Sequence, residues 1–104
     1  VTIEHTYRTD AVKNDTEVTG TVLGVLRDVL GEDQVFESPS PVAASDDVSI
    51  FLNRVPGCYL LVGGAQGDGS SGHHHSPTFS VDEQALRIGA TALATSALTL
   101  AQPG

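Results

Sequence analysis

Residues 58–62 read Cys-Tyr-Leu-Leu-Val, an uninterrupted apolar run that Pro56-Gly57 precedes and Gly63-Gly64 follows. An apolar run of this length between turn-forming residues is typical of a short strand that is buried on both faces. Strands of this kind occur in parallel sheets whose two faces are covered by helices. The run therefore predicts an α/β fold.

The start of the chain predicts another strand. Apolar, β-branched and aromatic side chains alternate there with polar ones, a period of two that indicates a half-buried strand. His5 lies on the apolar face of this strand and is expected to be a structural residue. The alternating residues are Val1, Ile3, His5 and Tyr7.

A helix is predicted to follow, capped by Asn14, Asp15 or Thr16 and ended by Gly31. Its apolar residues fall at helical spacing and form one face toward a core. These residues are Val18, Val22, Val25, Leu26, Val29 and Leu30.

The remaining segments continue the alternation of strands and helices. Residues 34–37 predict a short strand, and Ser45 or Asp46 is expected to cap a short helix that ends near Arg54, with Val48, Phe51 and Leu52 on its apolar side. A final helix is expected to begin at a capping box of Ser80 and Glu83 and to end at Pro103-Gly104. Its core face is predicted to comprise Leu86, Gly89, Ala90, Leu93, Ala97 and Leu100. The order strand-helix-strand-helix-strand-helix favours an α/β layer with parallel pairing.

Composition limits the possible partners. The 104 residues include 13 Asp and Glu against 5 Lys and Arg, a formal net charge of −8, which argues against nucleic acid or an anionic membrane as a partner. No apolar run is long enough to span a membrane, and a cytoplasmic location is expected. Cys58 is the only cysteine, so no internal disulfide forms. The absence of Met raises the expectation that the chain is a piece of a longer one.

The sharpest candidate for chemistry is His73-His74-His75-Ser76-Pro77, between a Gly-rich loop and a predicted helix start. Imidazole is the commonest metal ligand, so the triplet predicts a metal site. Three other interpretations stay open, namely a remnant of an expression tag, a solvated polar loop and adventitious metal binding by a His-rich tract.

Other polar groups give weaker signals. Asp46 and Asp47 could form an acid–base pair, but adjacent helical residues do not face each other, which favours a helix cap. Residues 63–69 lack the Lys-Ser/Thr ending of a phosphate-binding loop. Cys58 has no basic neighbour in the sequence to activate it and is expected to act as a small hydrophobe.

The ordered motifs resemble a known family. Asn14-Asp15, Ser45-Asp46-Asp47, Val55-Pro56-Gly57, His75-Ser76-Pro77-x-Phe79 and Asp82-Glu83 occur in the order found in the C-terminal quarter of metal-dependent amidohydrolases and carboxypeptidases. That family, peptidase family M20, includes hippurate hydrolase, aminoacylase-like enzymes and indole-acetyl-amino-acid hydrolases.

The resemblance implies a two-domain metallohydrolase that cleaves the amide bond of N-acyl amino acids or small peptides through metal-activated water. Residues 1–12 would then be the last strand of a lid domain that often mediates dimerisation, and residues 13–104 the C-terminal part of a three-layer catalytic domain. His75 maps to a ligand of zinc, manganese or a similar divalent ion, with His74 and His73 as alternatives. The implied parent is a homodimer.

Departures from the family pattern limit what this chain does alone. Asp46-Asp47-Val48 replaces Glu-Asp-Phe, and Ala44 replaces the glycine before the motif. The family's other metal ligands and its general base lie in earlier motifs, a Cys/His-x-Asp and a Glu-Glu, that these residues lack. The chain alone is therefore expected to be inactive, to carry no catalytic residue itself and to need the preceding part of the same polypeptide as its partner. The alternative is a stand-alone acidic α/β binding module with a non-catalytic surface His cluster.

Overall fold

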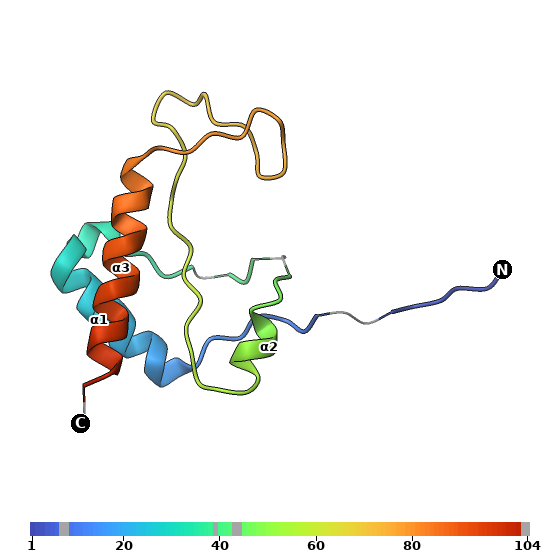
Figure 1. Cartoon of the computed structure of the whole chain (residues 1–104), viewed down its shortest axis with the longest axis horizontal. Helices are drawn as coiled ribbons and strands as arrows, with labels where there is room; N and C mark the ends of the chain where they lie inside the picture. Colours follow the sequence, from blue (N-terminus) through green and yellow to red (C-terminus); the bar gives the residue numbers. More distant parts are fainter. Residues whose placement is uncertain (7–8, 39, 43–44, 103–104) are drawn as a thin grey trace.

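The chain folds around two long helices that are joined by long irregular segments. A computed structural model describes residues 1–6, 9–38, 40–42 and 45–102. The helices are α1 (Thr16–Leu30), the 3-10 helix η1 (Glu32–Gln34), α2 (Ser49–Leu52) and α3 (Gln84–Leu100). Helices α1 and α3 pack against each other, while α2 lies apart from both (Figure 1).

The α/β prediction is wrong, because the described residues contain no strand. A strand needs a second extended segment about 4.8 Å away with which to exchange hydrogen bonds. Residues 58–62 are extended, but they run beside the helices and not beside another extended segment (Figure 1). Within the described part of the chain, the backbone groups of residues 60–62 form no hydrogen bond. The predicted layered order of strands and helices is therefore absent.

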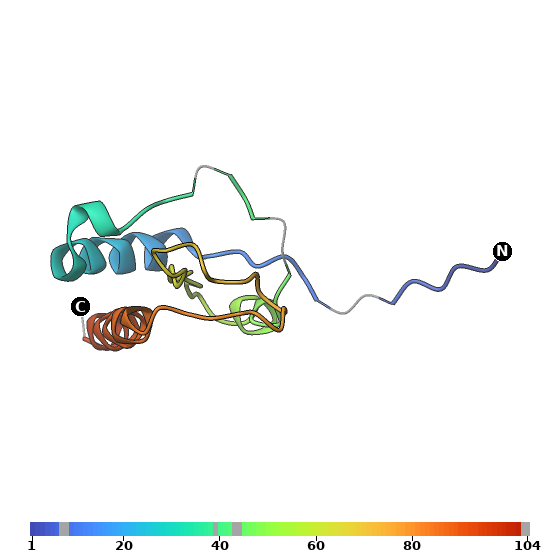
Figure 2. The same ribbon diagram turned by 90° about the horizontal axis from the view of Figure 1, so that it is seen from above.

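The first segment expected to be a strand also differs from its prediction. Residues 1–6 run away from the body of the molecule, as the two perpendicular views agree (Figures 1 and 2). Ile3 and His5 are exposed, so the expected structural role of His5 on an apolar face is wrong. Tyr7, the last residue of that predicted strand, lies outside the described residues.

The ends of α1 were predicted correctly. The Asp15 carboxylate accepts a hydrogen bond of 2.9 Å from the backbone N–H of Val18, so Asp15 is the N-cap among the three candidates. Gly31 ends the helix with φ 102°, and its N–H donates to the carbonyl of Arg27. Because a positive φ is costly for residues with a Cβ, glycine is the natural residue at this stop.

The core is small and lies between α1 and α3. Val22 and Leu26 of α1 and Ala92 of α3 are its buried centre, and Cys58 and Leu60 of the extended segment pack against it. The other residues expected on the core face of α1 are less buried, since Val18, Val25 and Leu30 are half-buried and Val29 is exposed. Leu23, which was not expected on that face, is buried. Since only one face of residues 58–62 is covered, the expectation that this run is buried on both faces is wrong.

Helix α3 uses a different face from the predicted one. The most buried residues of α3 are small, and they include Ala85, Gly89, Ala92, Ser96 and Thr99. Ala92 belongs to the core cluster with Val22 and Leu26 of α1. The predicted core residues Leu86, Leu93 and Leu100 are exposed. Small side chains allow close approach, and this face of α3 lies against both α1 and the segment at residues 60–64.

The start of α3 also corrects a prediction. The expected capping box of Ser80 and Glu83 does not form, and the helix begins at Gln84. The Asp82 carboxylate instead accepts a hydrogen bond of 2.9 Å from the backbone N–H of Gln84. The predicted stop at Pro103-Gly104 lies outside the described residues.

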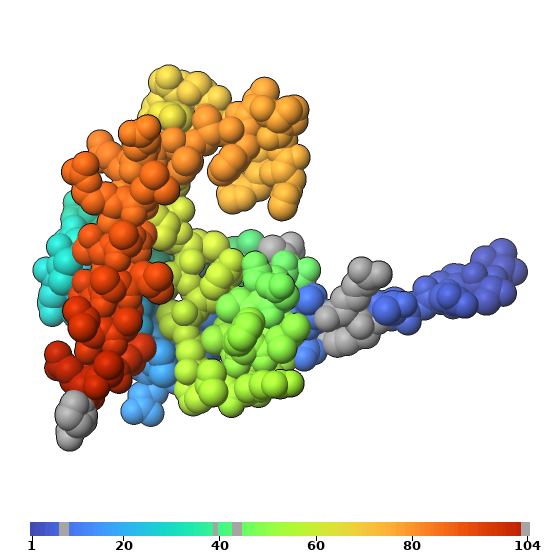
Figure 3. Space-filling view, viewed as in Figure 1, coloured from blue at the N-terminus to red at the C-terminus, as the bar shows by residue number. Residues whose placement is uncertain are grey.

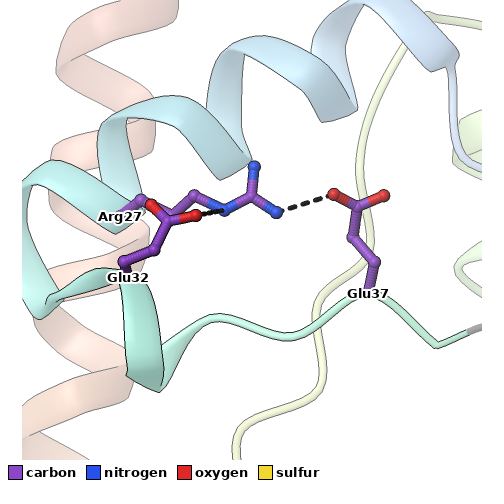
Figure 4. Close-up of polar contacts among 3 residues, drawn as sticks. All are labelled: Arg27, Glu32 and Glu37. Atoms are coloured by element: carbon purple, nitrogen blue, oxygen red, sulfur yellow. Dashed lines mark hydrogen bonds and ion pairs between the residues drawn. The ribbon is translucent and has the colours of Figure 1, made fainter.

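The segment after α1 is held by Arg27. Its guanidinium lies 2.7 Å from a Glu37 carboxylate oxygen and 3.4 Å from one of Glu32 (Figure 4). Residues 32–34 form η1, so the strand predicted at residues 34–37 is absent. This ion pair keeps the following extended residues close to α1 without any partner strand.

The chain as a whole, with its extended residues 1–6, is less compact than a typical domain. The radius of gyration of the Cα atoms is 16.5 Å, whereas a compact domain of this length measures about 13 Å. Among the helices of the described residues, none combines the length and the apolar character needed to cross a membrane.

Candidate functional site

The three adjacent histidines lie on a loop whose ends are drawn together. The backbone N–H of Gly72 donates a hydrogen bond of 3.0 Å to the carbonyl of Thr78, which closes the neck of the loop. A Cβ on Gly72 would lie 2.7 Å from the carbonyl carbon and oxygen of Thr78. Only glycine therefore permits this closure without a shift.

Two consecutive turns shape the interior of the loop. The N–H of Ser76 donates to the carbonyl of His73, and the N–H of Phe79 donates to the carbonyl of Ser76. The hydroxyls of Ser76 and Thr78 lie 3.1 Å apart and share a hydrogen bond. These bonds hold the loop in the compact form that stands out in the space-filling view (Figure 3).

The loop is tied to the start of α3. The N–H of Asp82 donates a hydrogen bond of 2.8 Å to the carbonyl of Gly64. The Gln66 side-chain amide donates to the carbonyl of Val81, and the Gln66 backbone N–H donates a hydrogen bond of 2.7 Å to the Ser71 hydroxyl oxygen. The histidines are thus presented from a loop that is anchored at both ends beside the helix.

The three imidazoles differ in their surroundings, although all three residues are exposed. The His74 ring packs on Phe79 with 5.1 Å between ring centroids, and it lies 6.4 Å from the His75 ring. No described ring packs against His73. Packing on Phe79 distinguishes His74 from the other two imidazoles, whose rings have no such contact with Phe79.

The backbone of His75 is unusual. Its φ of 62° is the only positive value among the described residues other than glycine. Left-handed residues with a Cβ are uncommon, and they gather at functional sites more often than elsewhere. The turn therefore sets the direction of the His75 side chain by imposing a conformation that the residue would not favour alone.

The described residues do not form a complete metal site. No group of three or more His, Cys, Asp or Glu among them is placed to hold a metal ion. A catalytic zinc ion needs three protein ligands. The loop fits the role of a contributor of one imidazole, and the remaining ligands would have to come from elsewhere.

A second polar cluster lies at the start of α2. The Asp46 carboxylate accepts hydrogen bonds from the Val48 backbone N–H at 2.9 Å and from the Tyr59 hydroxyl at 3.1 Å. These two donors hold the pKa of Asp46 below its ordinary value, while the carboxylate raises the pKa of Tyr59. These bonds favour the ionised form of Asp46. Asp46 does not cap α2, however, because the N-cap of that helix is Val48 and no described side chain bonds to the first turn.

Helix α2 is shorter than predicted. It spans Ser49–Leu52, although turns continue to Arg54. Ser49 is fully buried, whereas Phe51, expected on the apolar side, is exposed.

The segment that leads out of α2 is clamped by Asn14. The Asn14 side-chain amide donates a hydrogen bond of 3.0 Å to the carbonyl of Tyr59 and accepts one of 2.9 Å from the Tyr59 backbone N–H. A neighbouring strand would make the same pair of bonds. The N–H of Asp15 adds a bond of 2.9 Å to the carbonyl of Gly57. From the sequence, Asn14 was assigned to a possible helix cap and to the first of the family motifs. The residues next to Asn14 in the sequence give no signal for a contact 45 residues away.

A surface hollow of about 340 Å³ adjoins this clamp and is lined by residues 13–15 and 52–56. It includes part of the Val55-Pro56-Gly57 motif but none of the histidines. The histidine loop and the clamp are therefore separate places on the molecule.

Comparison with known proteins decides the family. Residues 1–99 match the model of peptidase family M20/M25/M40. The chain belongs to this family. The resemblance drawn from the ordered motifs is confirmed. The members of this family are generally metal-dependent.

Relatives of this M20-family chain carry the names of hydrolases and peptidases. Thermostable carboxypeptidase 2 of Saccharolobus solfataricus is 36% identical over 82% of the chain and 21% of its own length. An IAA-amino acid hydrolase of Arabidopsis thaliana is 34% identical over 71% of the chain and 17% of its own length. A probable hydrolase of Synechocystis is 28% identical over 84% of the chain and 22% of its own length.

The chain thus spans about a fifth of the length of these curated relatives. No solved structure matches it.

Proposed function

We propose that this chain is the C-terminal part of a metal-dependent hydrolase that cleaves the amide bond of N-acyl amino acids or small peptides. The family match over residues 1–99 is the observation that carries the proposal. The names of the relatives support the substrate class, since one describes hydrolysis of an amino acid conjugate and another a carboxypeptidase. Both names describe the removal of an amino acid from a larger molecule.

In this proposal His75 supplies one ligand of a divalent ion, zinc or manganese. The positive φ of His75 supports this choice over His74, whose ring packs on Phe79. His73 is the second alternative. An ion bound there would supply Lewis acidity and an activated water. The part of this chain is to hold the imidazole in place, because the loop neck and its anchors to α3 limit where that ring can lie.

The partner in this proposal is the preceding part of the same polypeptide, which contributes the other metal ligands and the general base. Residues 1–12 would belong to a lid domain, and the whole protein would be a homodimer. The separation of residues 1–6 from the helical body supports assigning these residues to a different domain (Figure 2). A stand-alone binding module has no specific observation in its favour.

The test compares single histidine variants in the longer polypeptide that contains these residues. We expect His75→Ala to remove about one metal ion per chain and to lower hydrolysis of an N-acetyl amino acid by at least roughly 100-fold, since loss of a ligand weakens metal binding strongly. Metal content is measured by elemental mass spectrometry after gel filtration, and hydrolysis by the release of free amino acid.

His73→Ala is the matched control, because it removes an exposed imidazole from the same loop. It is expected to retain both metal and activity. If His75→Ala keeps full metal content, the assignment of His75 is wrong, and if the unaltered protein hydrolyses no N-acyl amino acid or peptide, the proposed function itself is wrong.

A further inference from the structure

Helix α3 is apolar on more of its surface than the face that is buried in the described structure. Arg87 is the only charged residue among its 17 residues. Surface helices carry polar and charged residues opposite their buried face, whereas a helix that is apolar around most of its circumference is normally enclosed by protein. The composition of α3 is therefore that of an enclosed helix.

The uncovered apolar residues of α3 form a stripe beside the small-residue face. Spacings of four and three residues place Leu86, Ala90, Leu93, Ala97 and Leu100 along one side. Every member is exposed, including Leu86 at 66% and Leu93 at 74%. In the space-filling view, α3 lies at the front of the molecule and no other segment covers its outer side (Figure 3).

We infer that this leucine stripe is the surface on which the preceding part of the same polypeptide packs. About four-fifths of each relative lies outside the matched region, which is ample chain to cover one helix face. The small core between α1 and α3 leaves the stripe without a partner in the described residues. The inference rests on the proposed function in one respect, that the chain is part of a larger hydrolase.

A second copy of this chain is the competing occupant. An apolar helix stripe also suits a symmetric pair of helices, and in that case association would depend on protein concentration. The length of the relatives favours the preceding part of the polypeptide, since that part is joined covalently and needs no encounter between molecules.

The test uses two leucines of equal exposure on the same helix. Leu98 is 70% exposed, against 74% for Leu93, but it lies five residues further on and thus about 140° around the helix axis. Leu93→Gln and Leu98→Gln are compared by thermal unfolding in the 104-residue chain and in the longer polypeptide encoded by the reading frame that contains it.

We expect Leu93→Gln to lower the Tm of the longer polypeptide by at least about 5 °C, because it places an amide in a buried apolar contact. The same change in the 104-residue chain is expected to shift the Tm by less than about 2 °C, as is Leu98→Gln in both proteins. Metal content and hydrolysis play no part in this readout, so a wrong metal or substrate assignment would leave the result unchanged.

Three outcomes would overturn the inference. One is an unchanged Tm for Leu93→Gln in the longer polypeptide, or an equal fall for Leu98→Gln there. Another is a reading frame that encodes no further part of a hydrolase. The third is a 104-residue chain that dimerises in sedimentation experiments and loses the dimer with Leu93→Gln, which would assign the stripe to a second copy.

Discussion

At the scale of single residues, the closure of the histidine loop depends on Gly72, because glycine has no Cβ. The loop can close only where the backbone of Gly72 approaches that of Thr78, and a Cβ would overlap the Thr78 carbonyl. The direction of the three imidazoles follows from this closure, because the two turns that carry them lie between these residues.

Gly72→Ala is therefore expected to open the loop without unfolding the helices. The overlap costs about 1–3 kcal/mol if the loop stays closed, and opening the neck avoids it. NMR should show changed amide shifts for residues 72–79 and faster hydrogen exchange at position 72, with α1 and α3 unchanged. Gly67→Ala is the matched control, since no atom lies within 4 Å of its added Cβ. Unchanged loop signals in Gly72→Ala would show that the neck does not close.

Local residue chemistry was also the part of the structure most accessible from the sequence. The Asp15 cap and the Gly31 stop depend on a few neighbouring residues, and both predictions were correct. The clamp of Asn14 on Tyr59 joins residues 45 positions apart, so no local pattern indicates it. The histidine triplet was visible in the sequence, whereas the preference for His75 on structural grounds comes from its backbone and from the packing of His74.

At the scale of elements, α1 contains two glycines that have open space beside them in the described part of the structure. A Cβ on Gly20 or Gly24 would have no atom within 4 Å, and both residues are exposed. Glycine lowers helix stability through its backbone entropy, and here no close contact compensates for that loss.

Gly20→Ala and Gly24→Ala are each expected to stabilise the chain by about 0.5–1 kcal/mol. Gly31→Ala should act in the opposite direction, because φ is 102° there and its Cβ would lie 2.9 Å from a carboxylate oxygen of Asp33. Urea unfolding followed by circular dichroism measures all three variants. A loss of stability in either helix variant would mean that another group packs on that side of α1.

The elements whose prediction failed share a physical cause. Apolar periodicity shows that a face can be buried, but it does not identify what buries it. In α3 the leucine stripe was a plausible core face, yet the small residues beside it are the more buried ones, and Ala92 among them packs with Val22 and Leu26 of α1. The apolar run at residues 58–62 has the composition of a strand, but strand formation requires a neighbour that the described chain does not provide.

At the scale of the whole molecule, an extended arm is joined to a helical body. The body begins where Asp10 accepts a hydrogen bond of 2.8 Å from the Asn53 side chain. Residues 1–6 precede this point and are all exposed. Changes in the arm should therefore affect the free energy of unfolding of the chain less than changes in the body.

Deletion of residues 1–6 is expected to change the free energy of unfolding of the chain by less than about 0.5 kcal/mol, as for exposed sites without buried contacts. Asn14→Ala should cost about 1–3 kcal/mol, because it removes both hydrogen bonds to the Tyr59 backbone. Thermal and urea unfolding distinguish the two. A large effect of the deletion would show that the arm packs on the body in solution.

The pairing of α1 with α3 also constrains when folding can occur during synthesis. These helices lie near opposite ends of the chain, and the buried centre needs Val22 and Leu26 from one and Ala92 from the other. A ribosome adds residues from the N-terminus onward, so α1 is made long before α3 emerges. During that interval Val22 and Leu26 lack their contact with Ala92, so we expect the apolar face of α1 to stay accessible to chaperones until α3 has been made.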